Sequence, residues 1–205
     1  TYPHMLTREG VMGEENYKWS DKMTPEHNVT LAYTRLLAGQ MDYTPGGFLN
    51  VTQKQFKNQS PTLVSNTRAA ELAKFVVYES PFMCFCEHPD HVYGQVGEDF
   101  VQKVPTTWDD IKFLGGTPDT YVALAKKTGE QWYIGIINNS KQRTIQLDLS
   151  FLPKGNYELE YWKDGKKANS IATDCEHNKT KIASTKSLNV KLANAGGYVC
   201  IISRK

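Results

Sequence analysis

Long apolar runs are missing from this chain, and so is an excess of charge of either sign. Apolar stretches such as residues 133–137 are far shorter than the roughly 20 residues that cross a bilayer, so no membrane span is predicted. Lys and Arg number 24 against 22 Asp and Glu, which leaves a net charge of +2. The two signs are interspersed and no dense basic face is present, so the sequence predicts no nucleic-acid partner.

Cysteine is scarce and forms no recognised redox or metal motif. None of the four cysteines stands in a CxxC pair, and Cys84 and Cys86 would point to opposite faces of a strand. An initiator Met, a basic leader and an apolar signal segment are all missing at Thr1–His4. We therefore expect the chain to be an internal part of a larger protein.

Enough apolar side chains are present for a folded core. Hydrophobic residues make up 40% of the 205 residues and aromatic residues 11%, so their burial can offset the conformational entropy of the chain. This length allows one or two domains. The sequence pattern changes near Gly115–Pro118, and we expect two parts, residues 1–112 and residues 113–205.

The first part alternates short strand-like runs with helical patterns, which is typical of β/α units. Three strands are predicted, at residues 4–8, 40–43 and 82–86. Three helices are also predicted, at residues 25–38, 68–78 and 98–104. The first helix has the clearest signals, because Thr24 is a good N-cap, Pro25 suits the first helical position and Gly39 suits the end.

The second part shows apolar and polar residues in alternation, separated by turns. Lys127–Glu130 predicts a hairpin that joins strands at residues 121–125 and 131–137. Four further strands are predicted, around residues 145–149, 157–161, 188–192 and 198–202. Because no helical period interrupts these strands, the sequence predicts an antiparallel β-sandwich.

The densest group of potential catalytic residues is an acidic loop directly after the first predicted strand, with carboxylates at Glu9, Glu14 and Glu15. In an extended strand Glu9 and Glu15 would lie about 20 Å apart, at roughly 3.3 Å per residue. Only a chain that folds back brings them together, and Gly10 and Gly13 make that reversal sterically easy. The loop then either binds a hard cation such as Ca²⁺ or is a solvated acidic surface.

An ordered set of motifs resembles glycoside hydrolase family 97. They are YPHMLTREGVMGEENYKW (residues 2–19), TPEHN (24–28), LAGQMDYTPG (37–46), WDD (108–110) and residues 121–138. The whole chain resembles only the carboxyl-terminal part of that family. Its members have an amino-terminal β-sandwich, a (β/α)₈ TIM barrel and a carboxyl-terminal β-domain, and act on α-glucosides or α-galactosides with a bound calcium. The resemblance implies that residues 1–112 are the last three barrel units and residues 113–205 the β-domain.

The resemblance assigns Glu15 as the general acid and Glu9 as a calcium ligand, with Glu15 also bound by or close to the metal. Barrel enzymes build their sites at the carboxyl ends of strands, where both residues are predicted. A general acid delivers its proton to the leaving oxygen, while a second carboxylate attacks the sugar or activates water. The resemblance implies that this second carboxylate lies upstream of the chain, so we expect the chain alone to be inactive.

Other candidate residues lie at the ends of the second and third predicted strands. Asp42 and Tyr43 would contact sugar hydroxyls or support the site from behind, although a strand-end Asp also commonly caps its own loop. A zinc site of Cys86, His88 and His91 is a weaker hypothesis, because the spacing fits no common zinc pattern.

The sequence therefore favours one function and leaves an alternative open. The favoured function is the acid-bearing part of an exo-acting, calcium-dependent α-glucosidase or α-galactosidase. Its partners would be an α-glycoside or oligosaccharide substrate and the rest of the same protein. The alternative is a non-catalytic carbohydrate-binding or structural β-module. By resemblance, the enzyme would be periplasmic or secreted in a bacterium.

Overall fold

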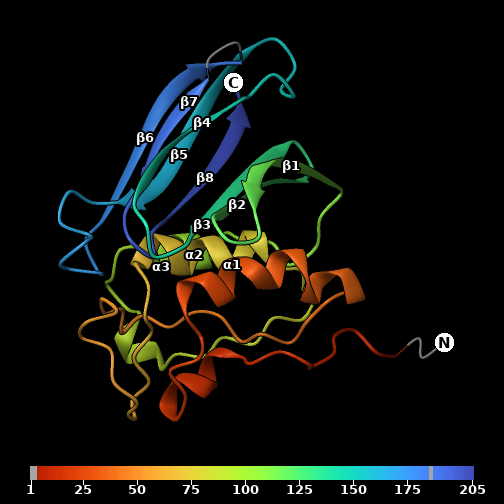
Figure 1. The fold of residues 1–205 in the computed structure, drawn as a ribbon. Coiled ribbons are helices and arrows are strands. Elements are labelled where there is room, and N and C mark those ends of the chain that lie inside the picture. Colours follow the sequence, from red (N-terminus) through yellow and green to blue (C-terminus); the bar gives the residue numbers. More distant parts are fainter. Residues whose placement is uncertain (1–3, 185–186) are drawn as a thin grey trace.

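The computed structural model describes residues 4–184 and 187–205, so the opening residues Thr1–Pro3 lie outside the described part. In Figure 1 the β-strands fill the upper half of the molecule, and the helices lie below them with long connecting segments. Within the described ranges, no helix is long and apolar enough to cross a bilayer.

The helical elements lie in the first part of the chain. They are η1 (Glu14–Lys18), α1 (Pro25–Tyr33), η2 (Arg35–Ala38), α2 (Arg68–Val77), η3 (Pro89–His91) and α3 (Glu98–Val101). The predicted start of the first helix is confirmed, because the Thr24 side chain accepts the His27 N–H at 3.1 Å. That helix breaks at Thr34, whose hydroxyl bonds back to the Thr30 carbonyl at 2.8 Å, and η2 continues to Gly39.

The three strands predicted in the first part do not form as strands. Arg8 and Met41 make one isolated parallel bridge, and the Asp42 N–H donates to the Arg8 carbonyl at 3.0 Å. The Met41 N–H donates to the Glu79 carbonyl at 3.1 Å. Three segments therefore lie side by side, but a sheet needs a longer ladder of such pairs. The predicted end of a (β/α)₈ barrel is not shown in the described residues.

The second part is an antiparallel β-structure, as predicted. Its strands are β1 (Asp110–Thr117), β2 (Tyr121–Thr128), β3 (Gln131–Asn138), β4 (Arg143–Leu147), β5 (Asn156–Asp164), β6 (Cys175–Ala183), β7 (Leu188–Leu192) and β8 (Gly197–Arg204). Six of them form one sheet in the order β1-β2-β3-β8-β5-β6, and β4 pairs with β7. The predicted hairpin is confirmed, since β2 and β3 pair in register across the turn at Gly129–Glu130.

The sequence analysis missed two strands, which are the two edges of the large sheet. β1 contains Gly115 and Gly116, which we had interpreted as the boundary between the two parts, and it has a bulge between Phe113 and Gly115. The predicted division at residues 112 and 113 falls inside this strand and stays a prediction. β6 was missed because its middle residues are polar and exposed on both faces, so no apolar alternation marks it.

The large sheet separates two hydrophobic cores. Ile134 and Ile136 of β3 enter the core between the two sheets, whereas Tyr133 and Ile137 enter the core shared with α2. This burial on both faces explains the nearly continuous apolar sequence of β3.

Two glycines allow α2 to approach the sheet closely. A Cβ at Gly135 would lie 2.7 Å from the Val76 Cβ, and a Cβ at Gly197 would lie 2.3 Å from the Ala70 Cα. All ten residues of α2 are buried, so the helix is enclosed between the sheet and the rest of the first part. The first part and the β-structure therefore share one packed interior.

We predict that Gly197→Ala lowers the free energy of unfolding by about 1–3 kcal/mol, because the added methyl meets helix backbone that cannot rotate away. Gly155→Ala is the matched control, since its Cβ would meet nothing closer than 3.6 Å. Urea unfolding of both variants measures the difference. Equal stability of the two variants would contradict the packing described here.

Candidate functional site

The acidic loop is held at its start by Arg35 of η2. The guanidinium donates to the carbonyls of Arg8 and Glu9 at 2.7 and 2.6 Å, and also to the Gly39 carbonyl at 2.9 Å. Gly10 follows with a φ of 83°, a left-handed conformation that turns the chain away from the preceding direction. The chain thus turns at Gly10 next to these Arg35 contacts, and the convergence of Glu9 and Glu15 stays a prediction.

Glu15 is exposed, yet its carboxylate has two protein partners. The Thr44 hydroxyl donates to Oε2 at 2.6 Å, and the Asn16 side-chain amide donates to Oε1 at 3.2 Å. The neighbouring Glu14 N–H donates to the Tyr43 carbonyl at 3.1 Å, which joins the acidic loop to the segment that carries Asp42 and Tyr43. The structure therefore brings Glu15 together with the end of the second predicted strand.

The other predicted site residues lie in different surroundings. Glu9 is exposed, and Asp42 is half-buried beside the Arg8 backbone. Tyr43 is 1% exposed, and its hydroxyl donates to the Asn28 side chain at 3.0 Å. Tyr43 thus points into the core, while Glu9 and Asp42 follow the two segments that the Arg8–Met41 bridge holds side by side.

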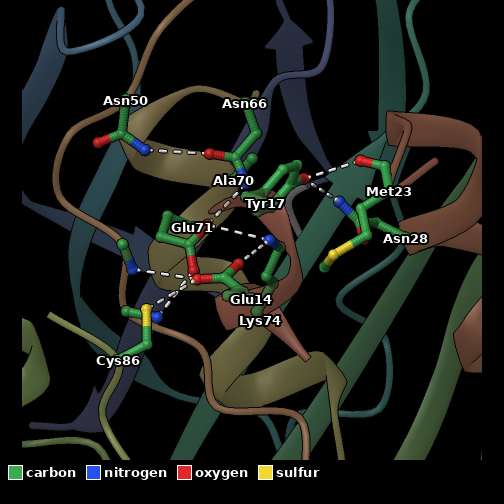
Figure 2. Close-up of polar contacts among 12 residues, drawn as sticks. Glu14, Tyr17, Met23, Asn28, Asn50, Asn66, Ala70, Glu71, Lys74 and Cys86 are labelled. Atoms are coloured by element: carbon green, nitrogen blue, oxygen red, sulfur yellow. Dashed lines mark hydrogen bonds and ion pairs between the residues drawn. The ribbon is translucent and has the colours of Figure 1, made fainter. Parts of the chain in front are cut away.

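A buried ionic cluster that the sequence analysis did not predict lies directly under this site. The Lys74 amine contacts one carboxylate oxygen of Glu14 and lies 3.0 Å from Glu71 Oε2, and all three side chains are 0–1% exposed. Figure 2 shows these three side chains converging, with Cys86 and Asn66 at the margins. We call Glu14, Glu71 and Lys74 the buried cluster.

The buried cluster also fixes the backbone of the TPGG turn, residues 44–47. The Gly46 N–H donates to Glu71 Oε1 at 2.8 Å, and the Gly47 N–H donates to Glu14 Oε2 at 3.1 Å. Glu14 belongs to the acidic loop and Glu71 belongs to α2. One cluster therefore holds the acidic loop, the turn and the helix in a single arrangement.

Burial and mutual repulsion set the charges in the cluster. Burial, and then the Glu71 carboxylate, raise the pKa of Glu14 to about 8 despite the nearby Lys74. Burial opposes ionisation of Glu71, but Lys74 and several hydrogen bonds lower its pKa overall. For Lys74, burial is outweighed by the two carboxylates, which raise its pKa. Lys74 is thus the cation between two buried carboxyl groups, of which Glu14 keeps its proton to the higher pH.

The histidine and cysteine residues of the proposed zinc site do not converge in the described part of the chain. The Cys86 thiol donates to Glu14 at 3.3 Å, whereas His91 lies 2.8 Å from Glu87 and His88 lies 3.6 Å from Asp90. Burial raises the pKa of the Cys86 thiol far above its usual range, and the thiol donates its proton to Glu14.

A different trio, Asp99, Glu160 and His177, has ligand atoms within 4.8 Å of one another. Lys103 already lies 2.8 Å from Glu160 and 3.4 Å from Asp99. The Trp162 indole donates to Asp99 at 3.2 Å and stacks on His177. This group is an ion-pair network that joins α3 to β5 and β6.

Comparison with known proteins relates this chain to the carboxyl-terminal portion of glycoside hydrolase family 97. Residues 107–203 match the family model described as glycosyl-hydrolase 97 C-terminal, oligomerisation. A retaining alpha-galactosidase of Bacteroides thetaiotaomicron is 33% identical over 202 residues, which cover 97% of this chain and 30% of that protein.

Solved structures agree with the sequence matches. A glycoside hydrolase family 97 enzyme from Pseudoalteromonas sp. strain K8, in complex with acarbose, has a TM-score of 0.88 at 32% identity, covering 100% of this chain and 32% of that one. A beta-arabinopyranosidase has a TM-score of 0.79 at 24% identity, covering 98% of this chain and 32% of that one, which shows the shared fold alone. The chain thus spans about a third of the length of the relatives it matches.

We predict opposite outcomes for two substitutions in the buried cluster. Lys74→Met leaves carboxyl groups buried without a cation and should cost about 3–5 kcal/mol of unfolding free energy. Glu14→Gln keeps the shape and resembles the protonated acid, so it should cost much less at neutral pH. Urea unfolding at pH 7 compares them. Similar losses in both variants would contradict the charges assigned here.

Urea unfolding of the wild-type protein and of Glu14→Gln at several pH values tests how stability depends on pH. The folded pKa of Glu14 is raised from 4.5 to about 8, so its proton is bound more tightly in the folded state. That contribution to stability is complete below pH 4.5 and is lost as pH rises toward 8. The wild-type protein should therefore lose stability relative to Glu14→Gln across that range.

Proposed function

The chain belongs to glycoside hydrolase family 97, as the carboxyl-terminal portion of its members, and on this basis we propose that it carries the general acid of an exo-acting, calcium-dependent α-glucosidase or α-galactosidase. Glu15 is the proposed acid. The observation that carries the proposal is the exposed Glu15 carboxylate, oriented by Thr44 and Asn16 beside the segment of Asp42. A glutamate that only keeps the surface polar would not need two hydrogen bonds to orient its carboxyl group.

In this proposal Glu15 protonates the glycosidic oxygen as the bond between the sugar carbon and that oxygen breaks. A second carboxylate, on the remainder of the protein, attacks the sugar carbon or activates water. The retaining activity in the name of the Bacteroides relative favours attack by that carboxylate. Residues 1–112 would be the last β/α units of a TIM barrel, a reading supported by the adjacent segments at Arg8, Met41 and Glu79.

Calcium fits the residues that this chain offers. Glu9 and Glu15 are exposed carboxylates, and oxygen is the ligand that Ca²⁺ prefers. The oxygens of Glu15 each accept one hydrogen bond and keep further lone pairs free. We propose that both residues hold the ion, which would supply positive charge next to the substrate, with more ligands from the remainder of the protein.

The sugar contacts are proposed on the segment next to Glu15, at Asp42 and Tyr43. Asp42 is half-buried and able to accept hydrogen bonds from sugar hydroxyls. The Tyr43 hydroxyl donates to Asn28 in the core, so in this proposal Tyr43 supports the segment of Asp42 through its packing.

A periplasmic or secreted location in a bacterium, which the family resemblance suggests, is part of the same proposal.

We predict that Glu15→Gln in the full-length enzyme acts selectively on substrates with poor leaving groups. A natural disaccharide should lose about 10²–10⁴-fold in kcat/KM, because general acid catalysis contributes that much. An aryl α-glycoside with a good leaving group should lose far less, since its oxygen needs no proton. Glu130→Gln, an exposed turn residue, is the matched control.

Equal losses on both substrates would refute the role of Glu15 as the acid. Unchanged activity on both would favour the alternative, in which the chain is a non-catalytic carbohydrate-binding or structural module. Sugar binding that is independent of residue 15 would support that alternative directly.

A second proposed function is assembly, which the matched family model names in its description. Of the two edges of the large sheet, β1 exposes the apolar side chains Ile111 and Phe113, at 50% and 59%. The other edge, β6, exposes polar residues such as Lys179 and Lys181, which discourage pairing. We propose that the β1 edge meets a second copy of the protein.

We predict that Ile111→Lys shifts the full-length protein toward a smaller assembly, because a charge would enter an apolar contact. Thr180→Lys on the exposed β6 edge is the control and should leave the assembly unchanged. Size-exclusion chromatography with light scattering measures both masses. A changed mass for the β6 variant alone would reverse the assignment of the edge.

A further inference from the structure

The orientation of Glu15 depends strongly on Thr44. An exposed glutamate normally keeps its rotamer freedom, and ordering it costs about 1.5–2 kcal/mol. Here the Thr44 hydroxyl donates to Oε2 at 2.6 Å, and Asn16 donates to Oε1 at 3.2 Å. The Thr44 hydroxyl also lies 2.6 Å from the Tyr43 carbonyl oxygen, so it lies between that oxygen and the Glu15 carboxyl group.

Thr44 has a backbone conformation that β-branched residues rarely adopt. Its φ of 57° lies in the left-handed region, where such a residue is strained by about 1–3 kcal/mol. Strain of this kind persists only where the surroundings impose it, and it concentrates at functional sites. The conformation is therefore an independent sign that Thr44 has a specific task.

The buried cluster is what imposes this conformation. On one side of Thr44, the Tyr43 carbonyl accepts the Glu14 N–H at 3.1 Å. On the other side, the N–H groups of Gly46 and Gly47 are bound by the carboxyl groups of Glu71 and Glu14. The backbone before and after Thr44 is thus hydrogen-bonded to buried residues, and the hydroxyl is presented to Glu15.

Gly13 leaves the space in which the Glu15 carboxylate lies. A Cβ at residue 13 would come within 2.4 Å of Glu15 Oε2 and 2.8 Å of the Tyr43 carbonyl oxygen. The backbone of Gly13 is extended, with a φ of −68°, so glycine is needed here for space and not for conformation. The Glu15 side chain therefore folds back over Gly13, where no side chain is in its way.

We propose that Thr44, presented by the buried cluster and assisted by the space at Gly13, is the positioning residue for the carboxyl group of Glu15. The inference rests on the proposed function of Glu15 as the general acid. An acid transfers its proton only when it lies within hydrogen-bond reach of the leaving oxygen. A displacement of about 1 Å at such a site costs about 10²-fold in rate.

The test uses Thr44→Val and Thr44→Ser in the full-length enzyme. Valine keeps the β-branched shape and removes the hydroxyl, whereas serine keeps the hydroxyl. With a disaccharide, Thr44→Val should lose about 10- to 100-fold in kcat/KM, and with an activated aryl α-glycoside it should lose only a few-fold. Thr44→Ser should recover most of the disaccharide activity.

Gly13→Ala is a second variant that leaves Thr44 intact. Its methyl would meet both the Glu15 carboxylate and the Tyr43 carbonyl oxygen, so Glu15 should be displaced and the same selective loss on the disaccharide is expected. Crystal structures of the variants provide a readout independent of activity, with the Glu15 carboxylate displaced or disordered. Thermal unfolding near the wild-type temperature confirms that the variants are folded.

Equal losses on the two substrates, or a Glu15 carboxylate that stays in place in Thr44→Val, would overturn the inference. Parallel measurements on Glu15→Gln separate this failure from failure of the proposed function. If Glu15→Gln shows the leaving-group selectivity and both Thr44→Val and Gly13→Ala lack it, only the positioning role is wrong. If Glu15→Gln also lacks it, Glu15 is not the acid.

Discussion

The interaction on which the rest of the site depends is the contact of Lys74 with Glu14 and Glu71 inside the protein. Charges without water are costly unless each has close partners, so this cluster tolerates little displacement. Its three members come from an acidic loop and a helix, and their oxygens bind the turn at residues 44–47. The exposed Glu15 thus lies on a segment whose neighbours are held by a buried group.

The adjacent residues Glu14 and Glu15 have different roles in this arrangement. Glu14 points inward and is buried, which raises the pKa of its carboxyl group, while Glu15 points outward to solvent. A short 3₁₀ helix, η1, starts at Glu14 and sends the two carboxyl groups in different directions. Two acids next to each other in sequence therefore serve separate purposes, one structural and one in the proposed chemistry.

The elements predicted correctly from the sequence are those that begin or end with a strong capping or turn signal. Thr24 and Pro25 marked the start of α1, and the Lys127–Glu130 turn marked the β2–β3 hairpin. β6 was missed because an exposed edge has no apolar alternation to detect. The candidate site residues were assigned by resemblance. The buried cluster was not predicted, because Glu71 and Lys74 at i, i+3 look like an ordinary surface pair until the fold buries them.

The close contact of α2 with β3 and β8 has a consequence for how such proteins diverge. Gly135 and Gly197 let the helix lie against the sheet, and α2 also supplies Glu71 and Lys74 to the site. A larger side chain on that sheet face would press on the helix and so shift the residues that it supplies to the buried cluster. Recombination that exchanges the β-structure between relatives would succeed only when its helix-facing residues already match the recipient, so the two halves are constrained to evolve together.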